Sequence, residues 1–337
     1  MSALLNIAPL GVTTLLLTLA VIYVNGLTDA PNSVATCITT RCMPLKSSVF
    51  LSAIFNFAGV LFMSKINFSV ADTVMSMVNF GSNTENAQIG LAAALFSIVL
   101  WAVLAWYFGI PTSESHALIA GLTGSAVAIN GGFDGININE WIKAIYGLFV
   151  SCGMGFSGGF LICKAVLCCF RNVKRRRAEN FFKALQIFAS AFMSFMHGAQ
   201  DGQKFIAVLM LIASTQTKSP DTLSLTLICS SVMALGTLTG GKKIIKSIGM
   251  DMLKAEKFQG FSADLAASVS LLVSTFSGFP VSTTHAKTTA IMGTGCATSS
   301  KKLNTGVIKD IALTWLLTFP GCAGLGFIMT KIFLKIF

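Results

Sequence analysis

Apolar stretches long enough to cross a lipid bilayer recur along the whole chain. Crossing the hydrocarbon core takes roughly 20 helical residues, so repeated stretches of that length are typical of a polytopic membrane protein. The pattern predicts two sets of helices in the same order. The first covers 4–25 with a continuation at 29–41, then 47–64, 88–109, 112–130 and 141–169; the second covers 180–197 with a continuation at 200–214, then 222–240, 262–279, 281–297 and 305–334.

Composition agrees with this all-α membrane interpretation. Hydrophobic residues make up 54% of the 337 positions and charged residues only 11%, against about 25% charged in soluble domains. These values exclude a soluble enzyme, a nucleic-acid-binding protein and a secreted domain. The net charge of +11 indicates basic cytoplasmic loops. We therefore expect a multi-pass protein of the cell membrane, surrounded by lipid, whose first apolar run is a membrane helix rather than a signal peptide.

Two motifs occur twice, which indicates an internal duplication. The segment Thr28-Asp29-Ala30-Pro31-Asn32 corresponds to Gln200-Asp201-Gly202-Gln203-Lys204, 172 residues later. The segment at 111–116 (PTSESH) corresponds to 280–285 (PVSTTH), 169 residues later. Two pairs at nearly one offset predict a first membrane repeat at 1–170, a basic cytoplasmic linker at 171–179 and a second membrane repeat at 180–337.

The charges of the loops predict that the two repeats have opposite orientations. Loop 65–87 carries one basic residue, whereas its counterpart 241–261 carries five. Loop 131–140 carries Asp134 and Glu140 and no basic residue, whereas its counterpart carries Lys301 and Lys302. Because basic residues accumulate on the cytoplasmic side, this reversal indicates inverted-topology repeats with a cytoplasmic linker and both termini outside. Each doubled first segment is interpreted as one discontinuous crossing.

Three carboxylates, Asp29, Glu114 and Asp201, lie in apolar context at motif positions, and we expect the other acidic residues in or near loops. Carboxylates at membrane depth usually mark ion or substrate pathways. Gly26 and Pro31 near Asp29, and Gly198 and Gly202 near Asp201, predict helix breaks that free backbone carbonyls. Such oxygens suit a hard cation such as Na⁺. The alternative is a buried pair with a lysine such as Lys204. The predicted cation-binding residues are Asp29, Asn32, Gln200 and Asp201.

The second motif supplies the complementary chemistry. Proline at 111 and 280 precedes serine and threonine clusters that begin new helices, and helix N-termini with hydroxyl donors bind phosphate or sulfate. Packing between membrane helices is the alternative role for such residues. The predicted substrate-binding residues are Ser113, Ser115, Ser282, Thr283 and Thr284.

All three histidines of the chain, His116, His197 and His285, fall in these motif segments. They either position the helix starts by packing or take part in proton transfer. Glu114 would repel an anion if it were ionised beside it. We therefore expect Glu114 to be protonated, to face a cation, or to point away from the substrate as a helix-start carboxylate. Glu114, His116 and His285 are thus the candidate coupling residues.

Both halves resemble the inorganic phosphate transporter (PiT) family, bacterial type, whose duplicated signature follows a G-A-N-D-x-x-N pattern. The matching segments are 25–33 (NGLTDAPNS) and 197–204 (HGAQDGQK), together with the Pro-x-Ser-x-x-His elements. The resemblance implies import of inorganic phosphate with Na⁺ or H⁺, by alternating access through two inverted repeats, and assembly as a homodimer. It also implies that Gln203 contributes to substrate binding.

Three departures from the family pattern leave the coupling ion and the oxyanion open. Thr28 and Gln200 replace an asparagine before each aspartate, and Glu114 replaces a small hydroxyl residue. A sulfate permease of the same fold is therefore the nearest alternative, followed by an anion channel. An intramembrane enzyme is disfavoured because the sequence has no nucleophile–base constellation. The sequence has no metal spacing such as HExxH or CxxC, and no cofactor is expected, although bound Na⁺ is compatible with the motif.

Overall fold

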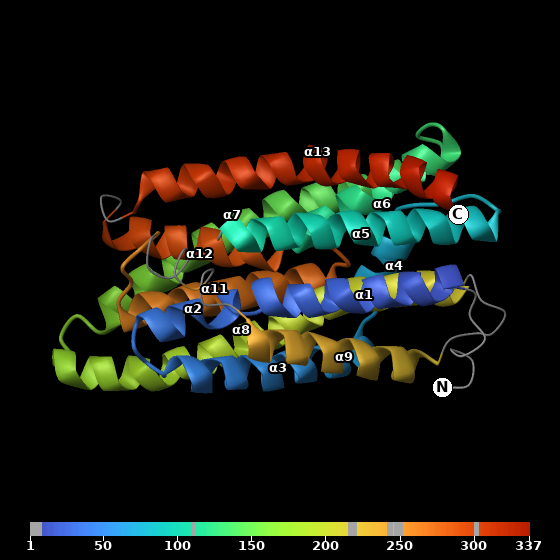
Figure 1. Cartoon of the computed structure of the whole chain (residues 1–337). Helices are drawn as coiled ribbons and strands as arrows, with labels where there is room; N and C mark the ends of the chain where they lie inside the picture. Colours follow the sequence, from blue (N-terminus) through green and yellow to red (C-terminus); the bar gives the residue numbers. More distant parts are fainter. Residues whose placement is uncertain (1–8, 109–111, 215–220, 241–244, 246–251, 300–302) are drawn as a thin grey trace.

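The computed structural model describes residues 9–108, 112–214, 221–240, 245, 252–299 and 303–337. These residues form a bundle of helices, which Figure 1 shows from the side. The helices of the first half are α1 Pro9–Thr28, α2 Asn32–Thr39, α3 Leu45–Ile66, α4 Ser69–Ser76, α5 Thr84–Phe108, α6 Glu114–Asn130 and α7 Ile138–Cys169. Those of the second half are α8 Arg175–Ser214, α9 Thr222–Thr239, α11 Lys257–Phe276, α12 Thr283–Thr298 and α13 Thr305–Ile336. The predicted all-α membrane fold is confirmed.

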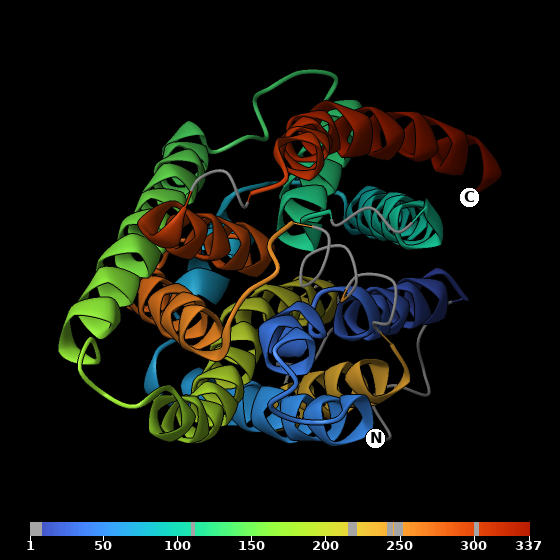
Figure 2. The same cartoon turned by 90° about the vertical axis from the view of Figure 1, so that its left-hand side faces the viewer.

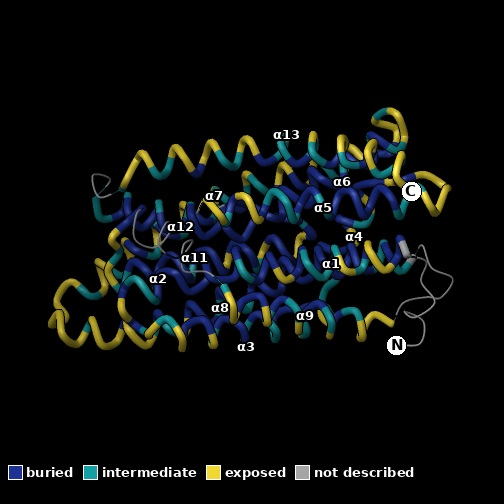
Figure 3. The backbone as a smooth tube through the Cα atoms, viewed as in Figure 1, coloured by how far each residue is buried: buried dark blue, intermediate teal, exposed yellow. Residues whose placement is uncertain are grey.

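Six candidate membrane spans meet the length and hydropathy expected of a crossing among the described residues. They are Leu10–Thr39, Leu45–Ile66, Thr84–Phe108, Ile138–Cys169, Thr222–Thr239 and Thr305–Ile336. Long side chains on these helices face outward, such as Phe149 and Leu316, each 71% exposed. Outward apolar side chains on a helix bundle fit a lipid environment. Figure 3 shows the buried residues concentrated inside the bundle.

The first predicted helix break is confirmed. Helix α1 ends at Thr28, and α2 begins at Asn32 directly after Pro31. Proline has no N–H to continue the α1 hydrogen-bond ladder, whereas it is tolerated where a new helix begins. The short turn places Asp29 and Ala30 between two helical segments, and both backbone N–H groups donate to the carbonyl of Asn25.

The second predicted break is wrong, because α8 is continuous from Arg175 to Ser214. Its glycines instead permit close packing against α3. A Cβ added at Gly198 would lie 2.2 Å from the Asn56 carbonyl oxygen, and one at Gly202 would lie 2.6 Å from the Val60 side chain. These glycines therefore serve contact between helices rather than a break. Since α8 begins at Arg175, it also takes in part of the predicted linker.

Two antiparallel helix pairs enter the bundle from its two ends. Helices α5 and α6 lie toward one end in Figure 1, whereas α11 and α12 lie toward the other. Viewed along the bundle, α7 and α13 lie at the periphery (Figure 2). The starts of α6 and α12 meet in the interior of the bundle, and side chains from both of them contact Asp201 in the middle of α8. Pro111 lies outside the described residues, and α4 is a short helix that the hydropathy pattern does not predict.

Candidate functional site

The starts of α6 and α12 have the same local geometry. Ser113 caps α6 by accepting a hydrogen bond from the His116 backbone N–H at 3.2 Å. Ser282 caps α12 in the same way, accepting from the His285 N–H at 3.2 Å. A serine at the N-cap satisfies one of the free amides of the first turn. The two motifs thus place hydroxyl-bearing residues at two buried helix N-termini.

The two motif aspartates converge, although they are far apart in the sequence. Asp29, His197 and Asp201 each present a potential ligand atom, and these atoms all lie within 4.8 Å of one another. All three residues are buried. The sequence predicts no metal-ligand spacing because Asp29 belongs to the α1–α2 turn, while the other two belong to α8. This group is nevertheless a geometrically reasonable place for a cation.

Asp201 has partners from four segments of the chain. Its Oδ1 accepts from the Lys204 ammonium at 2.6 Å and from the Ser115 hydroxyl at 3.3 Å. Its Oδ2 accepts from the Asn25 amide and the Thr283 hydroxyl, each at 3.3 Å. The alternative of a buried pair with Lys204 therefore holds for Asp201. Ser115 and Thr283, for which the sequence predicts substrate binding, donate to this carboxylate here.

Asp29 accepts fewer hydrogen bonds. Its Oδ1 accepts from the Thr284 hydroxyl at 3.0 Å, and Asn32 donates its amide to the same hydroxyl at 3.1 Å. Glu114, in the first turn of α6, accepts a hydrogen bond from Thr28 and is 1% exposed. Three carboxylates thus lie in one buried region, and the Lys204 ammonium bonds to one of them.

The two glutamines of the second motif point to other elements. Gln200 donates to the Phe279 carbonyl at 2.7 Å and accepts from Thr275 at 2.5 Å, which braces the end of α11. Gln203 accepts from the Val70 N–H at the start of α4 at 3.1 Å, and its amide nitrogen has no hydrogen-bond partner among the described residues. Their assignments to the cation and substrate sites stay predictions.

A second buried ion pair lies in the second half, and the sequence gives no sign of it. Asp264 of α11 is fully buried and pairs with Lys287 of α12, which corrects the expectation that the remaining acidic residues lie in or near loops. Asp264 also accepts from Ser190 at 2.6 Å and from Gln186 at 2.8 Å. The two charges are 23 residues apart, and their meeting depends on how α11 and α12 pack.

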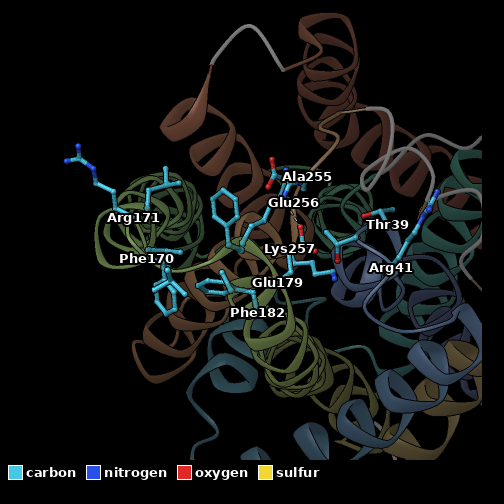
Figure 4. A pocket seen from close by; sticks show the side chains of 16 residues that line it. Thr39, Arg41, Phe170, Arg171, Glu179, Phe182, Ala255, Glu256 and Lys257 are labelled. Carbon is cyan, nitrogen blue, oxygen red and sulfur yellow. Dashed lines mark hydrogen bonds and ion pairs between the residues drawn. The ribbon is translucent and has the colours of Figure 1, made fainter.

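A cavity of about 570 Å³ lies at one end of the bundle, away from the motif residues (Figure 4). Its lining includes Arg41 after α2, Arg171 after α7, Arg175 at the start of α8 and Lys257 at the start of α11. The end of the α1–α2 pair therefore lies beside the start of α8. Acidic residues of α8 and of the α11 N-cap also line the cavity, so it is not a purely basic pocket.

Comparison with known proteins agrees with these features. A model of the phosphate transporter family matches residues 25–175 and 169–326. A probable low-affinity inorganic phosphate transporter of Bacillus subtilis is 33% identical over 94% of this chain and 96% of its own length. One of Rhizobium meliloti is 33% identical over 89% of this chain and 90% of its own length.

A solved structure described as "The sodium-dependent phosphate transporter" has the same fold. It matches with a TM-score of 0.86 and 20% identity, over 98% of this chain and 100% of that one. The relatives are transporters rather than enzymes, and the protein is a multi-pass protein of the cell membrane. On the strength of the family match over both halves, this chain belongs to the phosphate transporter family.

Proposed function

We propose that this protein imports inorganic phosphate together with a cation, by alternating access between the two sides of the cell membrane. The observation that carries the proposal is the convergence of Asp29 and Asp201 with the starts of α6 and α12. Carboxylates favour cations, whereas helix N-termini and hydroxyls favour oxyanions. The site therefore combines the chemistry of both transported species.

The charges of the site favour coupling over simple anion passage. When they are ionised, Asp29, Glu114 and Asp201 contribute three negative charges, against one positive charge from Lys204. Moving a univalent anion into a negative-inside cell opposes about 2.3 kcal/mol per 100 mV. Two or more accompanying cations reverse that sign and also offset the carboxylates. An anion alone would be repelled by this site.

We propose Na⁺ as the first candidate for the coupling ion. The groups around Asp29 are carboxylate, amide and hydroxyl oxygens together with the His197 imidazole, and oxygens are the ligands that hard cations prefer. The solved structure that matches this fold is that of a transporter described as sodium-dependent. H⁺ is the competing ion because Glu114, His116 and His285 adjoin the site.

The hydrogen bonds suggest how cation binding prepares the phosphate site. Thr284 donates to Asp29, and Thr283 donates to Asp201. A cation that binds at Asp29 neutralises part of its negative charge and weakens the hydrogen bond that Asp29 accepts from Thr284. The hydroxyls and the amides of α6 and α12 are then free to donate to phosphate. Cation and phosphate binding would thus be linked and reciprocal.

The α5–α6 and α11–α12 pairs enter the bundle from opposite ends, which supports an inverted-repeat mechanism. In such a mechanism the region around Asp29 and Asp201 stays near the pseudo-symmetry axis while the two repeats rotate relative to each other. The grouping of Arg41, Arg171, Arg175 and Lys257 at one end supports a cytoplasmic assignment for that end. Assembly as a homodimer stays a prediction, as do the repeat boundaries at 1–170 and 180–337.

A sulfate permease is the alternative, because sulfate satisfies the same hydroxyls and amides. Uptake of radiolabelled phosphate into proteoliposomes, measured with sulfate as competitor, tests the assignment. We expect saturable uptake that excess sulfate leaves nearly unchanged. If sulfate inhibits the uptake of labelled phosphate at the same concentrations as unlabelled phosphate does, the result would favour a sulfate permease. Flux that does not saturate and ignores the cation gradient would favour a channel.

A further inference from the structure

The two copies of the duplicated motif differ in charge at the position three residues after the aspartate. Positions 32 and 204 correspond in the duplicated motif, but the first is asparagine and the second is lysine. Lys204 is fully buried, as is Asp201. The first half therefore offers a neutral amide where the second half offers an ammonium group.

The Lys204 ammonium has the surroundings of a bound metal cation. It donates to Asp201 Oδ1 at 2.6 Å, to the Ser115 hydroxyl at 2.6 Å, and to the Val281 backbone carbonyl. These three oxygens come from α8, from the first turn of α6 and from the segment before α12. One carboxylate, one hydroxyl and one carbonyl form a ligand set that also suits Na⁺. The ammonium thus bridges both helix starts.

The half of the site around Asp29 shows the opposite situation. The Oδ1 atoms of Asn25 and Asn32 are buried and accept no hydrogen bond from the described residues. Each asparagine donates its amide nitrogen elsewhere, to Asp201 and to Thr284 respectively, which fixes which atom is the free oxygen. Unpaired buried acceptors are costly and require a partner. A cation beside Asp29 would supply one.

We propose that Lys204 is a tethered cation that occupies the position of one coupling ion in the second repeat, so that exchangeable cation binding is confined to the Asp29 side. The inference rests on the proposed function. It implies that the carrier moves one cation fewer per phosphate than a version with ions in both halves. It also implies that removing the ammonium creates a new exchangeable cation site at Asp201.

The test replaces Lys204 with the residue found at the equivalent position of the first repeat. Binding of radiolabelled phosphate to purified Lys204→Asn is measured over a Na⁺ series at constant ionic strength. By linkage, one additional Na⁺ steepens the slope of log affinity against log Na⁺ by about one. A tenfold rise in Na⁺ then improves affinity about tenfold more than in the unsubstituted protein. Lys204→Arg keeps a fixed charge and should keep the original slope.

Binding of ²²Na⁺ in the absence of phosphate tests the lysine independently of transport. We expect Lys204→Asn and Lys204→Ala each to bind one more Na⁺ per chain than the unsubstituted protein. Lys331→Asn is the matched control, because Lys331 donates to the Ala128 carbonyl away from the motifs and its loss should add no ion. An unchanged ²²Na⁺ count in both Lys204 variants would overturn the inference. Absence of phosphate binding by the unsubstituted protein would instead overturn the proposed function.

Discussion

The imidazole rings of His116 and His285 contact each other in the interior of the bundle, with centroids 4.4 Å apart and ring planes at 83°. Each histidine lies three residues after the serine that caps its helix. His116 also stacks on Phe319 at 4.5 Å, and His285 stacks on Trp315 at 3.5 Å. The equivalent residues of the two motifs thus brace the starts of α6 and α12 against α13.

This packing predicts that the histidines position the helix starts rather than carry the coupling proton. Neither ring nitrogen of His285 has a hydrogen-bond partner within the described part of the chain. We expect His285→Phe to keep phosphate uptake and its pH dependence. His285→Ala should lower thermal stability, because large-to-alanine changes in a core cost roughly 2–5 kcal/mol. A flattened pH profile in a stable His285→Phe protein would instead assign His285 to proton transfer.

The two motif aspartates should respond differently to neutralisation. Asp29→Asn should abolish coupled uptake and leave the protein folded, because the hydrogen bonds that Asp29 accepts come from neutral groups, the Thr284 hydroxyl and the Glu114 backbone N–H. Asp201→Asn should also abolish uptake, and it should reduce stability by about 3–5 kcal/mol because it leaves the buried Lys204 ammonium unpaired. Thermal unfolding in detergent measures the difference. The double variant Asp201→Asn with Lys204→Met should recover stability without uptake. Normal transport by monodisperse Asp29→Asn would refute the cation-site assignment.

Glu114 adjoins the same cation region through its contact with Thr28. If it faces a bound cation, Glu114→Gln should weaken the apparent Na⁺ affinity of uptake by about tenfold or more, since hydrogen bonds to charged groups contribute roughly 1.5–3 kcal/mol. The pH profile should be nearly unchanged. The variant Glu140→Gln, at the start of α7, serves as control. Unchanged Na⁺ affinity together with loss of pH dependence would show that Glu114 carries a proton.

The helices themselves follow from hydropathy, and most of the predicted spans lie within a few residues of the observed ones. The duplicated motifs also predict Asp29 and Asp201 as membrane-depth carboxylates and helix starts close to those of α6 and α12. These features are local or repeated, so they leave a signal in the sequence. The break before Asn32 is of this kind, because Pro31 cannot donate a backbone hydrogen bond to the ladder of α1.

Features that depend on packing between distant helices could not be predicted. The continuity of α8 is one, because Gly198 and Gly202 act through their contact with α3 rather than through backbone freedom. The Asp264–Lys287 pair is another, because neither residue belongs to a recognisable motif. The turn of Gln200 toward Phe279 also depends on the position of α11.

Accessibility of single cysteines tests the orientation of the bundle. In a background without the native cysteines, Arg175→Cys should react with a membrane-impermeant thiol reagent only from the cytoplasmic side. Asp134→Cys, in the turn between α6 and α7, should react only from outside. The basis is the grouping of basic residues around Arg175. Labelling of both positions from the same side would contradict the proposed topology.

Phosphate uptake into proteoliposomes with Na⁺ and pH gradients imposed separately tests cation-coupled import most directly. We predict that an inward Na⁺ gradient, at equal pH on both sides, drives phosphate accumulation above its external concentration. Asp29→Asn proteoliposomes should show no such accumulation. Uptake that only equilibrates phosphate under either gradient would contradict cation-coupled transport.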